Sequence, residues 1–410
     1  MPGFLDEQIK ATGSARVVCV LKREPDANQR QRWKKHFRRT PLQEAAGRGE
    51  PVHHFRHLGI IYGTVTADGL RTLRKEKDSF HAIHAAPAVR PIRALKPRPA
   101  AAAVGVVSWG LSFLEIEKLW SEGLTGNGVL VGHLDTGVDA THPDLADAVA
   151  SFVEVSQAGD VLTPGTPFDS SDHGTHTAGV IAARHKGGRI VGIAPRAMLA
   201  SAIVMEGGDM THRLLAGIDW AIGQGVRVLN CSLGLQDSWS QFQPVLRLVR
   251  WKNVLPVFAI GNEGPGTSRA PGNCPEALSV GAIDRNARVW PDSSSQHFQR
   301  PDDPIVPDLV MPGVDIISTD LNQGYREVDG TSLAAPHVSG LAALLWEAYP
   351  AATVAGIERA IYESCRRPAG VPAERVNRGV PNAARALEIL RRGVEVEKKA
   401  VPRRAARSAR

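Results

Sequence analysis

The stretch Gly330-Thr331-Ser332-Leu333-Ala334-Ala335-Pro336 is a tight turn that leads directly into a helix. Residues 337–346, which follow it, are apolar or small at nearly every position, and this predicts a helix buried on all sides. Pro336 is compatible with such a helix in its first turn, where amides have no helical partner. At a helix start, free N–H groups and the dipole favour negative charge, so Ser332 is placed either to attack a carbonyl or simply to cap the helix. This motif alone favours the cap.

Two further motifs favour the nucleophile. They are Asp135-Thr136-Gly137 and His173-Gly174-Thr175-His176-Thr177-Ala178-Gly179, so the chain carries Asp, His and Ser in that order. Over residues 109–390 the sequence resembles the subtilisin-type serine proteases (subtilases), in which the three catalytic residues occur in this order along the chain. The resemblance implies a doubly wound α/β fold, with a mostly parallel sheet and helices on both faces. It also implies a catalytic triad of Asp135, His173 and Ser332.

The same resemblance assigns the remaining parts of a protease site. Asn262, in a strand-end motif, matches the residue whose amide stabilises the oxyanion together with the Ser332 N–H. Further residues match the segments that line the substrate cleft: Ser232, Leu233, Gly234, Gly208, Ala259 and Gly261. The implied reaction is hydrolysis of protein or peptide substrates through an acyl-enzyme, without a required cofactor.

Three other interpretations compete with this one. Asp-Thr-Gly is also the aspartic-protease signature, but that mechanism needs two such carboxylates and this chain has a single copy. His173 and His176 could suggest zinc, but the metalloprotease helix spaces its histidines four apart with a glutamate between them. A catalytically silent or permanently inhibited binding protein with the same fold is the remaining alternative.

The N-terminal region predicts a second, smaller α+β unit. Strand patterns and helix-compatible segments over residues 15–85 give the order βαββαβ, as in ferredoxin-like domains. Its position before the protease region resembles that of a subtilase propeptide, a folding chaperone and inhibitor, although an unrelated accessory domain is the alternative. His53, His54 and His57 are expected on a solvated strand face rather than at a metal. The expected organisation is a disordered start (1–14), the propeptide-like domain (15–90), a Pro- and Ala-rich linker (91–107), the peptidase domain (108–390) and a basic, disordered tail (391–410).

Composition sets further expectations. Hydrophobic content of 43% suits a well-cored globular protein of 410 residues, and no apolar run is long enough to span a bilayer. The first residues lack a signal-peptide pattern, so we expect a cytoplasmic protein, with export by a non-classical route as the alternative. Four cysteines without metal-ligand spacing are expected to be reduced thiols. The net charge of +7 is concentrated at the ends, but nucleic acid is not the expected partner.

Two details depart from the family pattern or refine it. Asp144 matches a residue that binds a stabilising calcium in many subtilases, but the partner loop, residues 184–189, is cationic. Because calcium prefers carboxylate and carbonyl oxygens, we expect this site to be lost. Glu263, next to Asn262, suggests a preference for a basic residue before the cut.

Overall fold

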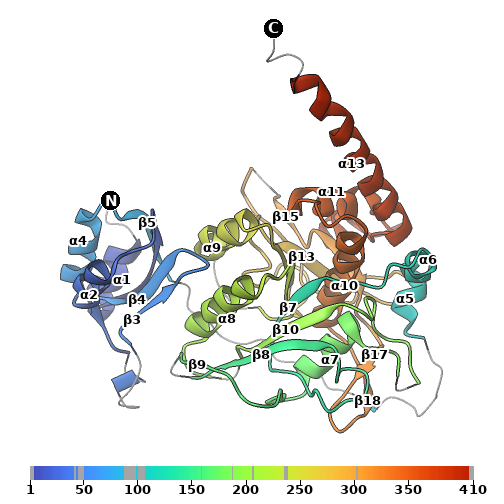
Figure 1. The fold of residues 1–410 in the computed structure, drawn as a ribbon, viewed down its shortest axis with the longest axis horizontal. Helices are drawn as coiled ribbons and strands as arrows, with labels where there is room; N and C mark the ends of the chain where they lie inside the picture. Colours follow the sequence, from blue (N-terminus) through green and yellow to red (C-terminus); the bar gives the residue numbers. More distant parts are fainter. Residues whose placement is uncertain are drawn as a thin grey trace.

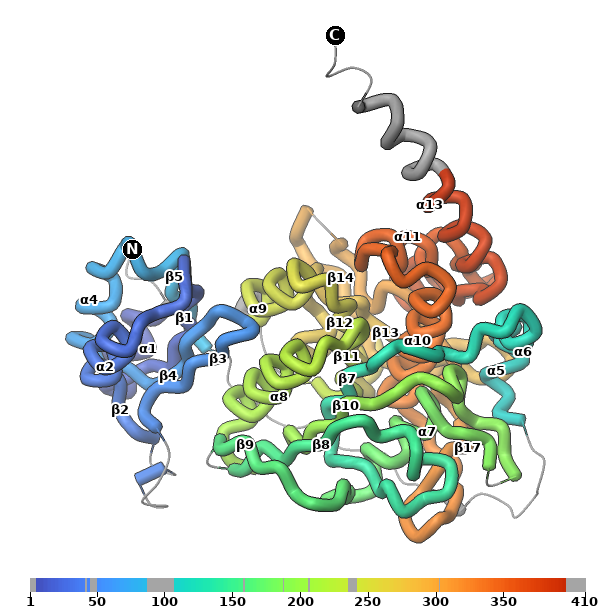
Figure 2. Tube along the Cα trace, in the orientation of Figure 1, coloured from blue at the N-terminus to red at the C-terminus, as the bar shows by residue number. Residues whose placement is uncertain are grey.

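The computed structural model describes residues 4–40, 43–44, 50–86, 98–99, 107–157, 159–186, 188–205, 207–234, 239–301 and 303–405. Figure 1 shows a small N-terminal unit beside a larger one that carries the rest of the chain. The Cα trace in Figure 2 shows the small unit lying next to helices α8 and α9 of the larger one.

The larger unit is built on one eight-stranded sheet. Its strand order is β16 (Leu309–Pro312), β13 (Leu278–Ile283), β12 (Leu255–Ala259), β11 (Val228–Cys231), β7 (Leu130–Asp135), β10 (Met198–Ile203), β8 (Val149–Val155) and β9 (Val161–Leu162). Neighbouring strands are parallel, except that β9 runs antiparallel to β8. The order reverses at β7, and in open α/β sheets ligands bind beyond the strand ends at such a reversal.

Helices cover both faces of this sheet, which confirms the α/β prediction. One face packs against α5 (Trp109–Phe113), α6 (Ile116–Ser121), α7 (His173–Ala182), α10 (Thr331–Ala348), α11 (Val354–Ser364) and α13 (Ala383–Ala405). The other face packs against α8 (Met210–Gln224) and α9 (Trp239–Trp251). Within β11, Val228 belongs to the first core and Leu229 to the second, as the alternation of side chains along a strand requires.

Helix α10 is buried from Thr331 to Trp346, as its uniformly apolar sequence predicts. However, the prediction that Pro336 lies in the first turn of this helix is wrong. Because the helix begins at Thr331, Pro336 lies just beyond the first turn, where an ordinary residue would donate its amide to the carbonyl of Ser332. The proline therefore leaves that carbonyl without its helical partner.

The small unit has an antiparallel sheet with its own core. The strand order is β2 (Phe37–Arg38), β4 (Ile60–Val65), β1 (Ala15–Leu21) and β5 (Phe80–Ala85), and β3 (Val52–Phe55) also pairs with β4. Helices α2 (Ala27–Lys34) and α4 (Ala67–Lys75) complete it. The predicted disorder of the first fourteen residues is wrong for α1 (Phe4–Thr12), because Leu5 and Ile9 are buried in this core.

The face of the small sheet rests on α8 through polar as well as apolar contacts. The Leu58 amide donates to Asp219 Oδ1 at 2.8 Å, and the Tyr62 hydroxyl donates to Asp209 Oδ2 at 2.7 Å. Arg16 lies 3.2 Å from the same Asp209 carboxylate, which also caps α8. Two carboxylates, one that caps α8 and one within it, thus bind the strand side of the small unit.

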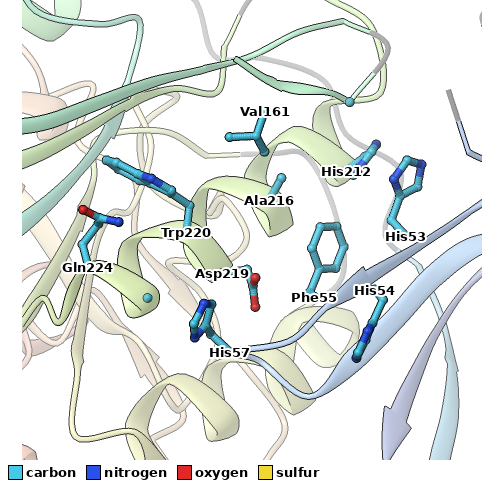
Figure 3. A pocket seen from close by; sticks show the side chains of 12 residues that line it. His53, His54, Phe55, His57, Val161, His212, Ala216, Asp219, Trp220 and Gln224 are labelled. Atoms are coloured by element: carbon cyan, nitrogen blue, oxygen red, sulfur yellow. The ribbon is translucent and has the colours of Figure 1, made fainter. Parts of the chain in front are cut away.

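The predicted solvated face for the strand histidines is wrong at His53. Its ring lies 3.7 Å, centroid to centroid, from that of His212 on α8, and Figure 3 shows the two side by side next to Phe55. The labelled residues line a cavity of about 370 Å³ between β3 and α8. Burial lowers the pKa of His53 to about 4 and that of His212 to about 2. At His53, the strand face that was expected to be solvated is therefore part of the contact between the two units.

The remaining segments border this framework. Of the predicted linker, β6 (Arg98–Pro99) pairs with β18 (Tyr325–Val328), which pairs with β17 (Ile316–Thr319), whereas residues 91–97 and 100–106 lie outside the described residues. Among the short elements, β14 (Gln296–His297) pairs with β15 (Ile305–Val306), and α12 (Ala373–Val376) contacts both. The disorder predicted for the basic tail is wrong as far as residue 405, because α13 continues to that point and projects from the body (Figure 1). The cysteines are free thiols, and no helix in the described ranges is both long and apolar enough to cross a membrane.

Candidate active site

Three neighbouring strands end at one edge of the sheet and carry polar residues there. Asp135 is the last residue of β7, Ser232 follows β11, and Asn262 lies shortly after β12. Helices α7 and α10, which begin with His173 and with Thr331-Ser332, pack against each other. Because parallel strands end at the same edge, the fold gathers residues from distant parts of the sequence.

Asp135 and His173 form a direct hydrogen bond. The His173 Nδ1 lies 2.7 Å from Asp135 Oδ1, and since an ionised carboxylate only accepts, the ring nitrogen donates. Asp135 is fully buried, and its carboxylate also accepts from the Thr136 amide at 2.8 Å and from Thr177 Oγ1 at 3.0 Å. These bonds fix the tautomer of His173, leaving Nε2 as the basic nitrogen of the neutral ring.

The charges of the two groups support each other. Burial opposes ionisation of Asp135, but the adjacent His173 and its hydrogen bond outweigh that cost, so the pKa of the carboxyl is lowered. Burial likewise opposes charging of His173, but the Asp135 charge and hydrogen bond outweigh it, so the pKa of the imidazole is raised. The pair is thus arranged to stabilise an imidazolium.

Ser332 lies in the first turn of α10 and retains 9% of its exposure. A Cβ placed on Gly330 would lie 2.9 Å from Ser332 Oγ and 3.6 Å from Asn262 Nδ2, so both atoms border the same small space. Among the contacts of the described residues, no hydrogen bond joins Ser332 Oγ to His173. Such bonds are often long in enzymes without substrate, and tighten when substrate binds.

Asn262 is held in one orientation by Thr331. Its side-chain oxygen accepts from the Thr331 amide at 3.0 Å and from Thr331 Oγ1 at 2.8 Å. With the oxygen engaged, the amide nitrogen is the group left to face the space beside Ser332. This is the arrangement that a donor to a developing oxyanion requires.

Two of the predicted cleft segments contact the first turn of α10. Ser232 Oγ donates to the Ser332 carbonyl at 2.8 Å, and the Gly261 amide lies 3.3 Å from Thr331 Oγ1. Ala259, the last residue of β12, and Leu233, two residues beyond the end of β11, are buried. Gly208 has φ +70°, and a Cβ there would lie 2.6 Å from the backbone oxygen of Gln157. Gly234 continues the β11 segment.

The other histidines near the triad residues are occupied elsewhere. His133 is buried with its ring nitrogens 2.9 Å from Ser201 Oγ and from Thr177 Oγ1, so both nitrogens have partners inside the core. His176 donates to the Ile316 carbonyl at 3.2 Å, and burial lowers its pKa to about 3. Within the described ranges, no group of three or more His, Cys, Asp or Glu side chains is arranged to hold a metal.

Asp144 is engaged by the cationic loop rather than facing open space. Its carboxylate accepts from the Lys186 amide and, at 2.6 Å, from the Tyr325 hydroxyl. The guanidinium of Arg189 stacks over the Tyr325 ring at 5.1 Å. Each carboxylate oxygen of Asp144 thus accepts a hydrogen bond from a donor of the protein itself.

Sequence reasoning missed several groups that support the site. Arg326 of β18 is buried and pairs with Asp172, the residue before His173, at 2.5 Å. The hydrogen bond from Arg326 lowers the pKa of Asp172 despite its partial burial. Thr177 was available as a signal, because it lies four residues after His173 and therefore on the same helix face. No local pattern marks Arg326.

The sequence of this chain is similar to those of known proteases. The profile of the subtilase family matches residues 126–385. The chain is 30% identical over 305 residues to a thermostable alkaline protease of Halalkalibacterium halodurans, covering 74% of this chain and 76% of that protein. It is 36% identical over 249 residues to subtilisin Savinase of Lederbergia lenta (60% and 86% covered), and 34% identical over 260 residues to subtilisin E of Bacillus subtilis (61% and 64% covered). The chain therefore belongs to the subtilase family and is a serine endopeptidase.

Proposed function

We propose that Ser332 is the nucleophile, His173 the general base and Asp135 the residue that orients the base. The observation that carries this assignment is the 2.7 Å hydrogen bond from His173 to the buried Asp135, together with the position of Ser332 in the first turn of α10, which packs against α7. Asn262 Nδ2 and the Ser332 amide are proposed as the donors to the oxyanion. The role of Asn262 is supported by the two bonds from Thr331 that fix its oxygen.

In this mechanism His173 Nε2 accepts the Ser332 hydroxyl proton as Oγ bonds to the scissile carbonyl carbon. The resulting imidazolium is stabilised by Asp135, and the negative oxygen by the two donors. The C–N bond then breaks, the amine leaves with the proton from His173, and an acyl-enzyme remains. Water then reacts in the same way: its oxygen bonds to the acyl carbon as His173 takes its proton, the ester bond breaks, the acid product leaves, and Ser332 Oγ takes the proton back from His173.

The test of the nucleophile compares two serines. Ser332→Ala should abolish both peptide cleavage and labelling by a fluorophosphonate. Ser201→Ala is the matched control, because Ser201 is a fully buried partner of His133 and should leave labelling in place. Undiminished labelling of the Ser332→Ala protein would overturn the assignment.

We further propose that the small unit is a ferredoxin-like propeptide that assists folding and inhibits the enzyme, and that the chain is made as a zymogen. Two observations support this. Its sheet is anchored on α8 through Asp209 and Asp219, and the buried Ala86 belongs to the shared core just before the chain leaves the unit.

Intact-mass measurement tests the zymogen. The wild-type protein should lose roughly its first hundred residues, because exposed connecting segments are the preferred sites of cleavage. Ser332→Ala should stay whole under the same conditions. A wild-type enzyme that is fully active while uncut would contradict an inhibitory role.

A further inference from the structure

An ion pair borders the cleft beside the oxyanion residue. Glu263 and Arg269 are joined through Glu263 Oε1 and Arg269 Nη2. The other carboxylate oxygen of Glu263 accepts from the backbone N–H of Asn262 at 3.1 Å and from Ser294 Oγ at 3.2 Å. Arg269 is buried, whereas the Glu263 side chain keeps 31% of its exposure. The pair is therefore fixed in place and accessible at its acidic end.

The pair fills the space next to Gly261. A Cβ on this glycine would lie 2.7 Å from Arg269 Cγ, 2.9 Å from Glu263 Oε2 and 2.9 Å from Ser294 Oγ. Gly261 also has φ +121°, a backbone conformation that side chains other than glycine rarely adopt. The volume beside this part of the cleft wall is thus already occupied by the chain's own side chains.

With Asn262 as the donor to the oxyanion, this place would lie next to the substrate residue that precedes the cut. The carbonyl oxygen of that residue would point at Asn262, and the carboxylate of Glu263 contacts the Asn262 backbone. The segments after β11 and β12 lie on either side of Ser332, held by Ser232 and by Gly261. The substrate side chain before the cut would therefore enter between these segments, with the ion pair at its far end.

We infer that the Glu263–Arg269 pair restricts the enzyme to short, uncharged side chains immediately before the cut. This inference rests on the proposed function of Ser332 and Asn262. The pair shortens the space available, and because its charges compensate each other it offers no net attraction to a basic or an acidic side chain. The basic preference suggested by Glu263 alone is accordingly not supported by the structure.

The experiment measures kcat/KM for four peptides that differ only before the cut, with Ala, Phe, Lys or Glu. The wild-type enzyme should prefer Ala to each of the others by about tenfold or more, the lower end of what pocket size discriminates. Arg269→Gly leaves the Glu263 charge uncompensated, so the Lys peptide should gain about tenfold relative to Ala. Glu263→Gln leaves the Arg269 charge uncompensated, so the Glu peptide should gain instead. The double variant should favour Phe.

Opposite shifts in the two single variants distinguish selection from a structural role, which would lower all four values together. Glu263→Gln changes size very little and keeps the test valid if Arg269→Gly unfolds. Arg250→Gln is the matched control, because Arg250 forms a half-buried pair with Glu358 between α9 and α11 and should leave the ratios unchanged. Identical ratios in all variants, or a wild-type preference for Phe, would overturn the inference. A wild-type enzyme that neither cleaves any peptide nor takes up a fluorophosphonate would instead overturn the proposed function, and the inference with it.

Discussion

The Ser232 hydroxyl donates a 2.8 Å hydrogen bond to the backbone carbonyl of Ser332. That carbonyl lacks its helical partner because Pro336 has no amide to donate. Asn230 Nδ2 in turn donates to Ser232 Oγ at 3.1 Å, and Ser339 donates to Asn230. A buried chain of hydrogen bonds thus ties the end of β11 to the first turn of α10, where the proposed nucleophile lies.

This chain of bonds predicts coupling between Ser232 and Pro336. In a Ser332→Ala background, which prevents self-digestion, Ser232→Ala should lower the free energy of unfolding by about 1–2 kcal/mol, since it leaves a buried carbonyl unsatisfied. With Pro336→Ala also present, the new amide can supply the helical bond and the loss should shrink. Urea unfolding of the four combinations measures the coupling. Strict additivity would show that the two residues act independently.

Replacing Asp135 by Asn should abolish most of the activity while keeping the shape of the site. We expect kcat to fall by about 10⁴-fold, as in other enzymes with this triad, because the amide no longer stabilises the tautomer and the charged form of His173. Steady-state kinetics on a peptide substrate measures the loss. Asp169→Asn is a useful comparison, because that carboxylate contacts Thr136 and Thr175 rather than His173. A much larger loss in the Asp169 variant would contradict the assigned roles.

The dependence of activity on pH should reflect the interaction between Asp135 and His173. Asp135 raises the pKa of His173, and catalysis needs the neutral ring, so activity should be lost as pH falls through a value above the ordinary imidazole pKa. In Asp135→Asn this acidic limb should move to lower pH, because the stabilising charge is gone. The measurement is kcat/KM against pH for both proteins. An unchanged limb would mean that His173 is not the titrating base.

Much of this site could be predicted from local sequence, for a physical reason. Apolar runs that end in Asp135 or shortly before Asn262 identify strands, and parallel strands bring their ends together. Contacts between segments that are distant in the sequence produce no such local pattern. Thus the burial of His53 depends on a helix more than 150 residues away, and the role of Arg269 depends on the fold of the loop after β12. Helix α1 is not evident from the sequence because, among its side chains that the structure describes, just Leu5 and Ile9 are buried in this short segment.

Asp144 should stabilise the protein without calcium. Its carboxylate is held by the Lys186 amide and the Tyr325 hydroxyl, so Asp144→Asn should lower the free energy of unfolding by about 1–3 kcal/mol. The difference in Tm between this variant and its parent, both with Ser332→Ala, should be equal in calcium and in EDTA. A difference present only in calcium would show that Asp144 binds the ion after all.

The contact between His53 and His212 should make the small unit sensitive to acid. Burial lowers the pKa of both rings below the ordinary value of 6.5, so each ring is neutral in the contact and takes up a proton more readily when the units separate. The contact should therefore be fully stable above pH 6.5 and weaken as pH falls, by up to about tenfold per unit for each ring until its lowered pKa is reached. Asp209, Asp160 and Glu50 also act on His53 and oppose this shift, but burial outweighs them.

Small-angle scattering of the uncut Ser332→Ala protein measures that separation. The radius of gyration should rise between pH 7 and pH 4, as the small unit leaves α8 while remaining tethered to the chain. A control with both His53→Phe and His212→Phe keeps two flat rings in the contact but removes their titration. It should stay compact over a wider range of pH, because its rings have no proton to accept. If the control and its parent open at the same pH, other groups in the contact, such as Asp209 and Asp219, must carry the acid response.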